Sequence, residues 1–185
     1  FRGDTTVADA YLTPVLNRYL ESFTSPFEEK TKIYFMQSNG GLVDRHHFSG
    51  KDSLLSGPAG GVVGAVKTCE NLGFRRVIGF DMGGTSTDVS HYDGKYEVRE
   101  ENLIAGVRVR APVIDIHTVA AGGGSKISFD GQRFRVGPES AGAAPGPACY
   151  RNGGPLTITN CNVLLGRIQE DDFPKVFGAS GKESI

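Results

Sequence analysis

Apolar and polar positions follow two periods along the chain, one typical of helices and one typical of strands. Apolar side chains recur three and four residues apart between residues 4 and 23, which predicts a first helix. Pro14 lies inside this pattern and can kink the helix or delay its start. Residues 32–37 are rich in β-forming side chains and lead into a Ser-Asn-Gly-Gly turn, so they predict a first strand.

A second helix is predicted over residues 57–72. Ser56 is a suitable N-cap, and Gly73 suits the position that follows the last turn. Glycines inside a helix lower its intrinsic stability by about 1 kcal/mol each. We therefore expect backbone or ligand to pack closely against the small-residue face of this helix.

The remainder of the chain is predicted to form short strands, an irregular segment and a closing helix. In chain order we expect a strand ending at Phe80, a returning strand from Val89, an Asp93-Gly94 hairpin turn with a strand over 96–99, and a strand over 113–119. These are followed by a hairpin with strands 126–129 and 133–136, an irregular Gly/Pro-rich segment over 137–154, and a helix over 157–168 with Val163, Leu164, Leu165 and Ile168 on its inner side. Residues 1–169 are expected to belong to one core, and residues 170–185 to a polar tail or linker.

Residues 81–88, here called the glycine turn, carry the chemistry most easily interpreted from the sequence. An apolar run ends in Asp81, small residues follow, and a second apolar run begins after Asp88. Glycines allow the backbone to approach a ligand closely, and the exposed N–H groups of such a turn form an anion-binding nest. The motifs GxGxxG and GxxxxGK[ST] are both absent. The pattern predicts a phosphate-binding turn between two strands, and an ordinary glycine-rich hairpin turn is the alternative.

Composition narrows the class of protein further. The 185 residues contain 20 Lys and Arg against 21 Asp and Glu, a formal charge of −1 with no basic run, which argues against nucleic-acid binding. Three widely spaced cysteines favour a reducing compartment over a disulfide framework or a thiolate zinc site. Neither a membrane-spanning apolar stretch nor a signal peptide is visible, so we expect a cytoplasmic protein. The 26 glycines occur in clusters between ordered segments, as expected around a ligand cleft.

The order of the predicted elements resembles the second half of the core of actin-like ATPases, such as heat-shock chaperones and sugar kinases. Longer motifs resemble the hydantoinase/oxoprolinase family, and one phrase near the end is most similar to ATP-dependent 5-oxoprolinases. The motifs are residues 56–64, 80–90, 118–125, 136–142, 145–150 and 153–159, and the oxoprolinase-like phrase is 172–178.

The resemblance implies a partial α/β fold of the actin-like ATPase (ribonuclease H-like) type, with a mixed sheet and flanking helices. Family members are several times longer and carry a first phosphate turn near their N-terminus, which this chain does not contain. The chain is therefore expected to be an internal fragment that is inactive alone. The remainder of the same polypeptide or a partner subunit completes the cleft, and the full enzyme is expected to be a homo-oligomer.

The family's chemistry implies a cyclic-amide hydrolase that opens 5-oxoproline or a hydantoin while ATP phosphorylates the amide oxygen. ATP and Mg²⁺ are the implied cofactors, and the charge of the phosphates must be neutralised. Asp81 is expected to hold Mg²⁺ through water or to orient the attacking group, and Asp88 to brace the turn. The nucleotide-binding residues implied are Gly83, Gly84, Thr85 and Ser86, together with Gly122, Gly123, Gly124 and Ser125.

Two further groups of residues are weaker candidates. Asp115 and His117 are two apart on a predicted strand and therefore face the same way, so they can share a metal or a proton. A solvated or hydrogen-bonded pair is the alternative interpretation. Glu139 and Ser140, in the predicted irregular segment, are candidates for lining a substrate pocket.

Two other functions fit the same scaffold. One is an ATP-dependent ketone carboxylase, which the phrase at residues 172–178 disfavours. The other is a non-enzymatic actin-like switch, which would use a polymerising or protein-binding surface in place of a small-molecule pocket. The segment 136–150 argues against the switch, because neither chaperone ATPases nor filament subunits have such a loop.

Overall fold

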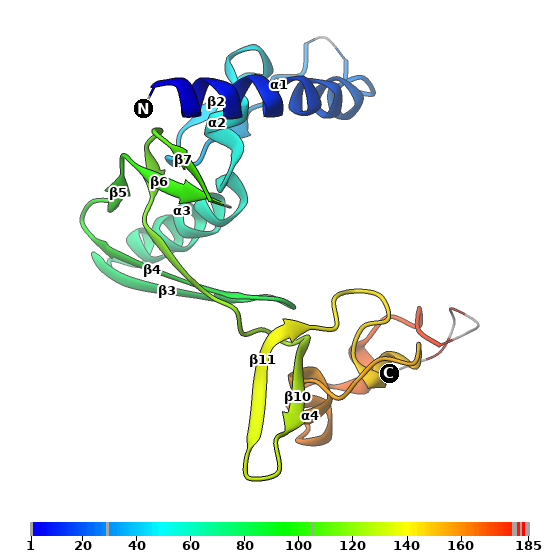
Figure 1. The fold of residues 1–185 in the computed structure, drawn as a ribbon. Helices are drawn as coiled ribbons and strands as arrows, with labels where there is room; N and C mark the ends of the chain where they lie inside the picture. Colours follow the sequence, from blue (N-terminus) through cyan, green and yellow to red (C-terminus); the bar gives the residue numbers. More distant parts are fainter. Residues whose placement is uncertain (1, 29, 105, 179–180, 182, 184–185) are drawn as a thin grey trace. The chain divides into compact units, whose positions relative to one another are not determined.

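The computed structural model describes residues 2–28, 30–104, 106–178, 181 and 183 (Figure 1). It divides into two compact units. The first unit comprises Phe1–Gly79 and Val89–His117, and the second comprises Phe80–Asp88 and Thr118–Ile185. The glycine turn therefore belongs to the second unit, although the strands on both sides of it continue into the first.

The first unit begins with helix α1 (Arg2–Thr24), which confirms the predicted helix and runs through Pro14 without a break. The helix packs against α2 (Gly50–Ser53) and β7 (Val107–Val109). Polar side chains of α1 hold the start of α2, because Thr13 Oγ1 accepts from the N–H of Gly50 at 3.0 Å and Asp9 accepts from that of Lys51 at 2.9 Å. Two polar side chains of α1 therefore bind the first N–H groups of α2.

Helix α3 (Ser56–Asn71) forms the centre of the first core. The N-cap position is occupied by Leu55 rather than by the predicted Ser56, and the buried Ser38 Oγ accepts from the Leu55 N–H at 3.2 Å. Leu55 provides no side-chain cap, and the Ser38 hydroxyl instead anchors the N-cap residue through its own N–H. Gly73 follows the helix with a φ of +87° and donates to the Glu70 carbonyl at 2.9 Å, which confirms the predicted C-terminal end. The core residues around α3 are Ala59, Val62, Val66, Tyr92 and Ile114.

The close packing expected at the glycines of α3 is absent at the described positions. A Cβ added at Gly57 or Gly64 would meet open space, and one at Gly60 would make only ordinary contact with Met36, at 3.6 Å. Within the described chain, no backbone packs closely against these three glycines, and the expectation that a ligand does so stays a prediction.

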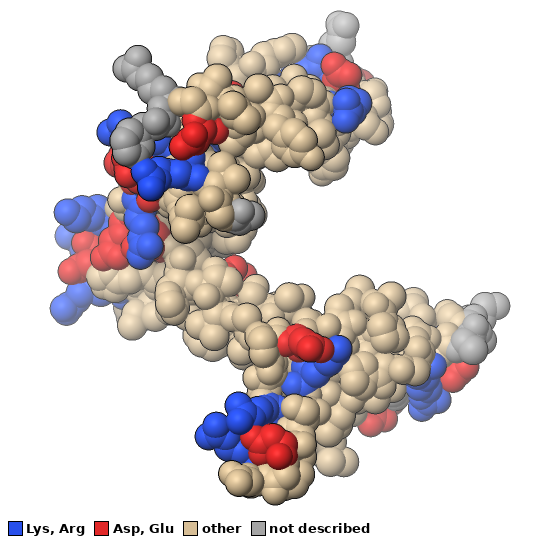
Figure 2. All heavy atoms as spheres, in the orientation of Figure 1, with Lys and Arg blue, Asp and Glu red and all other residues tan. Residues whose placement is uncertain are grey.

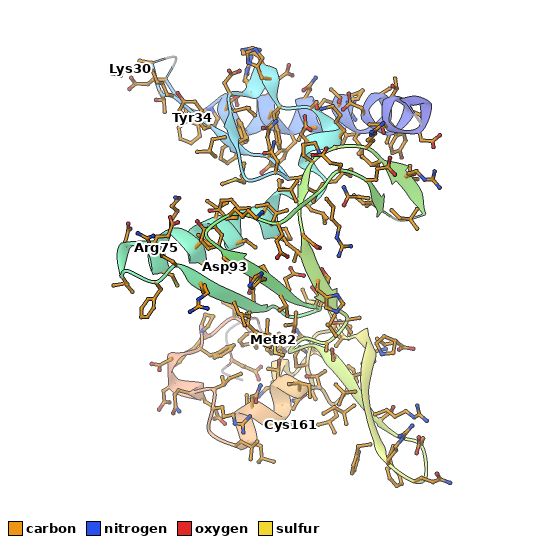
Figure 3. All side chains as sticks on the ribbon, turned by 90° about the vertical axis from the view of Figure 1, so that its left-hand side faces the viewer. Lys30, Tyr34, Arg75, Met82, Asp93 and Cys161 are labelled. Carbon is orange, nitrogen blue, oxygen red and sulfur yellow. The ribbon has the colours of Figure 1, made fainter. Side chains whose placement is uncertain are left out.

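The sheet around the glycine turn has the order β3-β4-β9, formed by β3 (Arg76–Met82), β4 (Thr87–Asp93) and β9 (Ile116–Val119). This confirms the predicted strand, turn and returning strand. Met82 ends β3 beside the turn, whereas Asp93 ends β4 at the far end of the same strand pair (Figure 3). The hairpin therefore presents its small residues at one end only.

The other strands of the first unit are shorter than predicted. Strand β5 (Val98–Arg99) pairs with β8 (Val113–Ile114) and not with β4. Across the Asp93-Gly94 turn, the chain forms only an isolated bridge between Tyr92 and Tyr96. The predicted strand 113–119 is divided between β8 and β9. Two further antiparallel pairs complete this unit: β1 (Phe35–Met36) with β2 (Leu42–Val43), and β6 (Asn102–Ile104) with β7.

The second unit contains the hairpin of β10 (Ser125–Phe129) and β11 (Phe134–Ser140), followed by α4 (Ile158–Leu164). The predicted hairpin is confirmed, but β11 extends to Ser140 into the segment expected to be irregular. Helix α4 ends at Leu164 rather than at residue 168. Leu164 is 88% exposed and Leu165 is 64% exposed, so their predicted inward orientation was wrong within the described chain.

Short 3₁₀ turns lie on either side of α4, at Ala148–Tyr150 and Glu170–Asp172. Phe177 stacks on Tyr150 with ring centroids 4.3 Å apart, and the Gly178 N–H donates to the Tyr150 carbonyl at 3.0 Å. The oxoprolinase-like phrase at residues 172–178 therefore packs on the motif at 145–150, within one unit.

Charged side chains of opposite sign lie beside one another on the face shown in Figure 2. Two of the ion pairs among the described residues join Arg99 to Asp115 at 2.8 Å and Arg135 to Asp130 at 2.6 Å. Among the described residues, no helix combines the length and the apolar character needed to cross a membrane.

A hydrogen-bonded cluster joins the end of α3 to β4. Glu70 accepts from the Tyr92 hydroxyl at 2.6 Å and pairs with Lys67 at 2.8 Å. The hydrogen bond from Lys67 and that from Tyr92 lower the pKa of Glu70, and the bond to Glu70 raises the pKa of Tyr92. Charged Glu70 therefore stabilises the fold above the ordinary carboxyl pKa, and this stabilisation is lost as the pH falls through the lowered value.

We predict that Glu70→Gln lowers the urea midpoint of unfolding at pH 7. The difference from the parent protein should shrink between pH 7 and pH ~3, because the carboxyl group of the unfolded chain takes up a proton before that of the folded protein as the pH falls. Glu100→Gln, at an exposed glutamate, is the matched control and should leave the urea midpoint unchanged. A difference for Glu70→Gln that is constant between the two pH values would contradict the assignment.

Candidate functional site

The glycine turn is closed by its own backbone. The N–H of Gly83 donates to the Ser86 carbonyl at 2.9 Å, and the residues from Asp81 to Thr85 are exposed. The N–H groups of Gly84, Thr85 and Ser86 donate to no other residue in the part of the chain that the structure describes. Three consecutive N–H groups of the turn are therefore available as hydrogen-bond donors, and their binding to an anion stays a prediction.

A second backbone segment supports this turn from one side. This glycine triplet, Gly122–Gly124, donates twice: Gly123 N–H to the Gly83 carbonyl at 3.0 Å and Gly124 N–H to the Gly84 carbonyl at 2.6 Å. Residues forty positions apart are thereby joined by two adjacent backbone hydrogen bonds. The segment predicted to bind nucleotide thus lies directly against the glycine turn.

Glycine is required at both ends of the triplet because the two backbones approach so closely. A Cβ at Gly122 would lie 2.7 Å from the Gly83 carbonyl oxygen and 2.7 Å from the Thr85 nitrogen. A Cβ at Gly124 would lie 2.8 Å from the Gly84 carbonyl oxygen. Backbone atoms cannot move aside as a flexible side chain can, so each added methyl group would displace the turn.

Hydroxyl groups fix both segments from behind. The buried Thr87 donates to the Ala121 carbonyl at 2.5 Å, and Thr118 donates to the Asp88 carboxylate at 2.7 Å. Ser125, fully buried, accepts from the Gly122 N–H at 2.9 Å. In α4, the hydroxyl and the N–H of Thr159 both donate to the Gly123 carbonyl at 2.8 Å. The carboxylate of Asp88 is therefore positioned by the Thr118 hydroxyl.

The candidate substrate residues lie next to one another at the end of β11 but face different surroundings. Ser140 Oγ would be 2.8 Å from a Cβ at Gly124, and it accepts from the Gly142 N–H at 3.1 Å. Glu139 forms an exposed ion pair with Lys126 at 2.8 Å, and the hydrogen bond from Lys126 lowers the pKa of Glu139. Only Ser140 of the two is beside the triplet.

The Asp115–His117 pair belongs to the first unit and Asp81 to the second. Asp115 is paired with Arg99 at 2.8 Å, and its N–H donates to the Glu97 carbonyl at 2.8 Å. The described residues contain no group of three or more His, Cys, Asp or Glu side chains arranged to hold a metal. The carboxylate of Asp115 thus has a cationic partner on the neighbouring strand, and His117 is exposed.

Sequence reasoning missed the threonines that anchor the site, Thr87, Thr118 and Thr159. Each is a hydroxyl residue inside a motif that was otherwise interpreted through its glycines. Their role depends on carbonyl and carboxylate groups that lie up to thirty-six positions away. No local pattern in the chain indicates such partners.

The hydantoinase/oxoprolinase family matches residues 2–185. The chain belongs to this family. It is 55% identical over 188 residues to the 5-oxoprolinase of Saccharomyces cerevisiae, an alignment that covers all of this chain and 15% of that protein. The chain thus spans about 15% of the length of this relative. The resemblance inferred from the motifs is confirmed.

Two solved structures share the fold. A nucleotide-free structure of acetone carboxylase superposes on this chain with a TM-score of 0.73 at 29% sequence identity. The alignment covers 90% of this chain and 24% of the acetone carboxylase chain. The ATP-dependent caprolactamase from Pseudomonas jessenii superposes with a TM-score of 0.73 at 34% sequence identity. That alignment covers 97% of this chain and 27% of the caprolactamase chain. These are hydantoinase-type proteins with an actin-like ATPase fold, so the predicted α/β fold class is confirmed.

We predict that Gly122→Ala destabilises the protein, because the new methyl group would meet the backbone of Gly83 and Thr85. Overpacking of this kind costs about 1–3 kcal/mol. Gly84→Ala is the matched control within the same site, since a Cβ there would meet nothing within 4 Å. Urea unfolding measures both variants, and equal stabilities would contradict the close approach described above.

Proposed function

We propose that the chain forms one wall of the nucleotide site of an ATP-dependent cyclic-amide hydrolase that opens 5-oxoproline to glutamate, with a hydantoin as the alternative substrate. The observation that carries the proposal is the exposed run of unpaired N–H groups at Gly84, Thr85 and Ser86, supported from behind by the glycine triplet. Such a run suits the β- and γ-phosphates of ATP. The 55% identity to a protein described as a 5-oxoprolinase supports this substrate class.

Each residue of the turn then has a role. Gly83, Gly84, Thr85 and Ser86 cradle the phosphates, and Asp88 braces the turn through Thr118. Asp81 is exposed at the end of β3 and makes no ion pair or hydrogen bond with the described side chains. An unpaired carboxylate beside a phosphate turn fits Mg²⁺, which commonly binds through one or two carboxylates, substrate phosphates and water. Mg²⁺ would neutralise the charge that develops on the phosphates.

The chemistry needs activation of a stable amide. The γ-phosphoryl group passes from ATP to the amide oxygen and ADP leaves, which makes the ring carbon electrophilic. One water then adds to that carbon, and the C–N bond breaks with protonation of the nitrogen, which leaves an acyl phosphate. A second water cleaves the acyl phosphate to the free carboxylate and phosphate. In this scheme the protein mainly positions groups and stabilises charge. Ser140, beside the triplet, and Glu139 are the proposed contacts to the substrate.

The chain alone provides only part of this site. Because it spans about 15% of the length of its yeast relative, we propose that the remainder of the polypeptide or a partner subunit supplies the opposite wall of the cleft. We further propose that the full-length enzyme is a cytoplasmic homo-oligomer. The 185-residue chain by itself is then expected to be inactive.

The direct test is ADP release by the full-length enzyme with Mg-ATP, with and without 5-oxoproline. We predict release stimulated by 5-oxoproline, and none from the 185-residue chain. A hydantoin replaces 5-oxoproline in a second arm. Acetone with bicarbonate forms a third arm, because the acetone carboxylase shares this fold. Stimulation by the ketone alone would replace the hydrolase with a carboxylase, and no stimulation by any substrate would refute the proposal.

We predict that Asp81→Asn lowers the rate of 5-oxoproline-dependent ADP release about 100-fold, because the carboxylate proposed to hold the charge-neutralising Mg²⁺ is removed. The matched control is Asp93→Asn, at the far end of the same hairpin, which should leave the rate unchanged (Figure 3). Thermal unfolding of both variants verifies folding. A rate for Asp81→Asn within twofold of the parent enzyme would exclude the proposed role.

A further inference from the structure

We propose that the glycine triplet acts as an orienting support for the phosphate-binding N–H groups, and that Thr159 is the positioning residue from which this support is held. The proposal rests on the function proposed above, because it assigns how the glycine turn acquires its phosphate-binding shape. It concerns residues that do not touch the nucleotide themselves.

All three N–H groups of the triplet are donated within the protein. Gly122 donates to Ser125 Oγ, Gly123 to the Gly83 carbonyl and Gly124 to the Gly84 carbonyl. None of them is left for a nucleotide. The triplet therefore contributes to the site through the hydrogen bonds that it donates to two carbonyl groups of the glycine turn.

Holding those carbonyls determines where the free N–H groups point. In a planar trans peptide, the C=O of one residue and the N–H of the next point in opposite directions. Because the Gly83 carbonyl faces the triplet, the N–H of Gly84 faces away from it. The same argument applies to the Gly84 carbonyl and the N–H of Thr85. Two hydrogen bonds thus aim two consecutive donors at the same side.

The same rule extends one step further back, to α4. The Gly123 carbonyl accepts from both the hydroxyl and the N–H of Thr159, each at 2.8 Å, so the adjoining Gly124 N–H is directed at the glycine turn. A continuous series of hydrogen-bonded peptides therefore runs from Thr159 through Gly123–Gly124 and Gly84 to the Thr85 N–H. Hydrogen bonds in series polarise one another, so the last donor becomes a stronger one.

Thr159 is well placed for this role. It is 9% exposed, and a Cβ at Gly123 would lie 2.9 Å from its hydroxyl oxygen, so the contact is close and shielded from water. A parallel series begins at the Ser125 N–H, which donates to the Gly122 carbonyl at 3.0 Å, and ends at the Gly84 N–H. Only the Thr159 series begins with a side chain that can be removed by substitution.

The test is Thr159→Val in the full-length enzyme, with Thr159→Ser as the conservative variant. Loss of one neutral hydrogen bond behind the Thr85 donor should raise the KM for ATP about fivefold. We expect kcat to change less than the KM for ATP, and the KM for 5-oxoproline not to change. Thr159→Ser should restore the parent values, because it keeps the hydroxyl group.

The matched control is Thr157→Val, at the N-cap position of α4. Thr157 is fully buried, but its hydroxyl bonds to Asn160 at 3.0 Å and not to the triplet. It should lower stability without raising the KM for ATP. If Thr157→Val raised that KM as much as Thr159→Val, general destabilisation would explain the result and the proposal would fail.

Amide hydrogen exchange of the same enzymes provides a readout that does not depend on turnover. We expect faster exchange at Gly124 in Thr159→Val but not in Thr157→Val. If the parent enzyme shows no ATP turnover while this exchange difference appears, the support stands and the proposed function fails. If turnover is normal and neither the KM for ATP nor the exchange at Gly124 changes, the support itself is excluded.

Discussion

Two adjacent backbone hydrogen bonds, from Gly123 and Gly124 to the carbonyls of Gly83 and Gly84, are the constraint on which the candidate site depends. They require the two backbones to lie closer than a Cβ allows, which explains glycine at positions 122 and 124. They also leave the outward N–H groups of the turn unpaired. An exposed turn without such support would sample many conformations, and binding a phosphate would then include the cost of ordering it.

The glycine turn was predictable from sequence because its signal is local. An apolar run, a carboxylate, small residues and a second apolar run are contiguous, and the strands β3 and β4 follow that pattern directly. The support was only partly predictable. The glycine triplet was identified as belonging to the site, but its partners were not, since Gly123 and Gly83 are forty positions apart and no periodicity encodes which carbonyl a distant N–H will meet. The threonines that hold both segments were missed for the same reason.

The fold shows the same division between local and distant determinants. Helices α1 and α3 and the β10–β11 hairpin follow from periodicity and turn residues. The two-residue strands β5 and β8 do not, because their pairing depends on the path of the intervening chain. The apolar pattern also overpredicted burial, because Leu164 at the end of α4 is 88% exposed. In the proposed larger enzyme, such faces are available for packing against the rest of the polypeptide.

A phosphate site built from backbone donors has a consequence for how the sequence can vary. The N–H groups of Gly84, Thr85 and Ser86 do not depend on side-chain identity, whereas the support behind them requires glycine at two positions and a hydroxyl at Thr159. Sequence constraint is therefore displaced from the residues that would touch the ligand to those that orient them. Side-chain donors would lose rotamer freedom on binding, but peptide groups already held by hydrogen bonds lose little. In the proposed site, the support would therefore hold the turn in place before a phosphate binds.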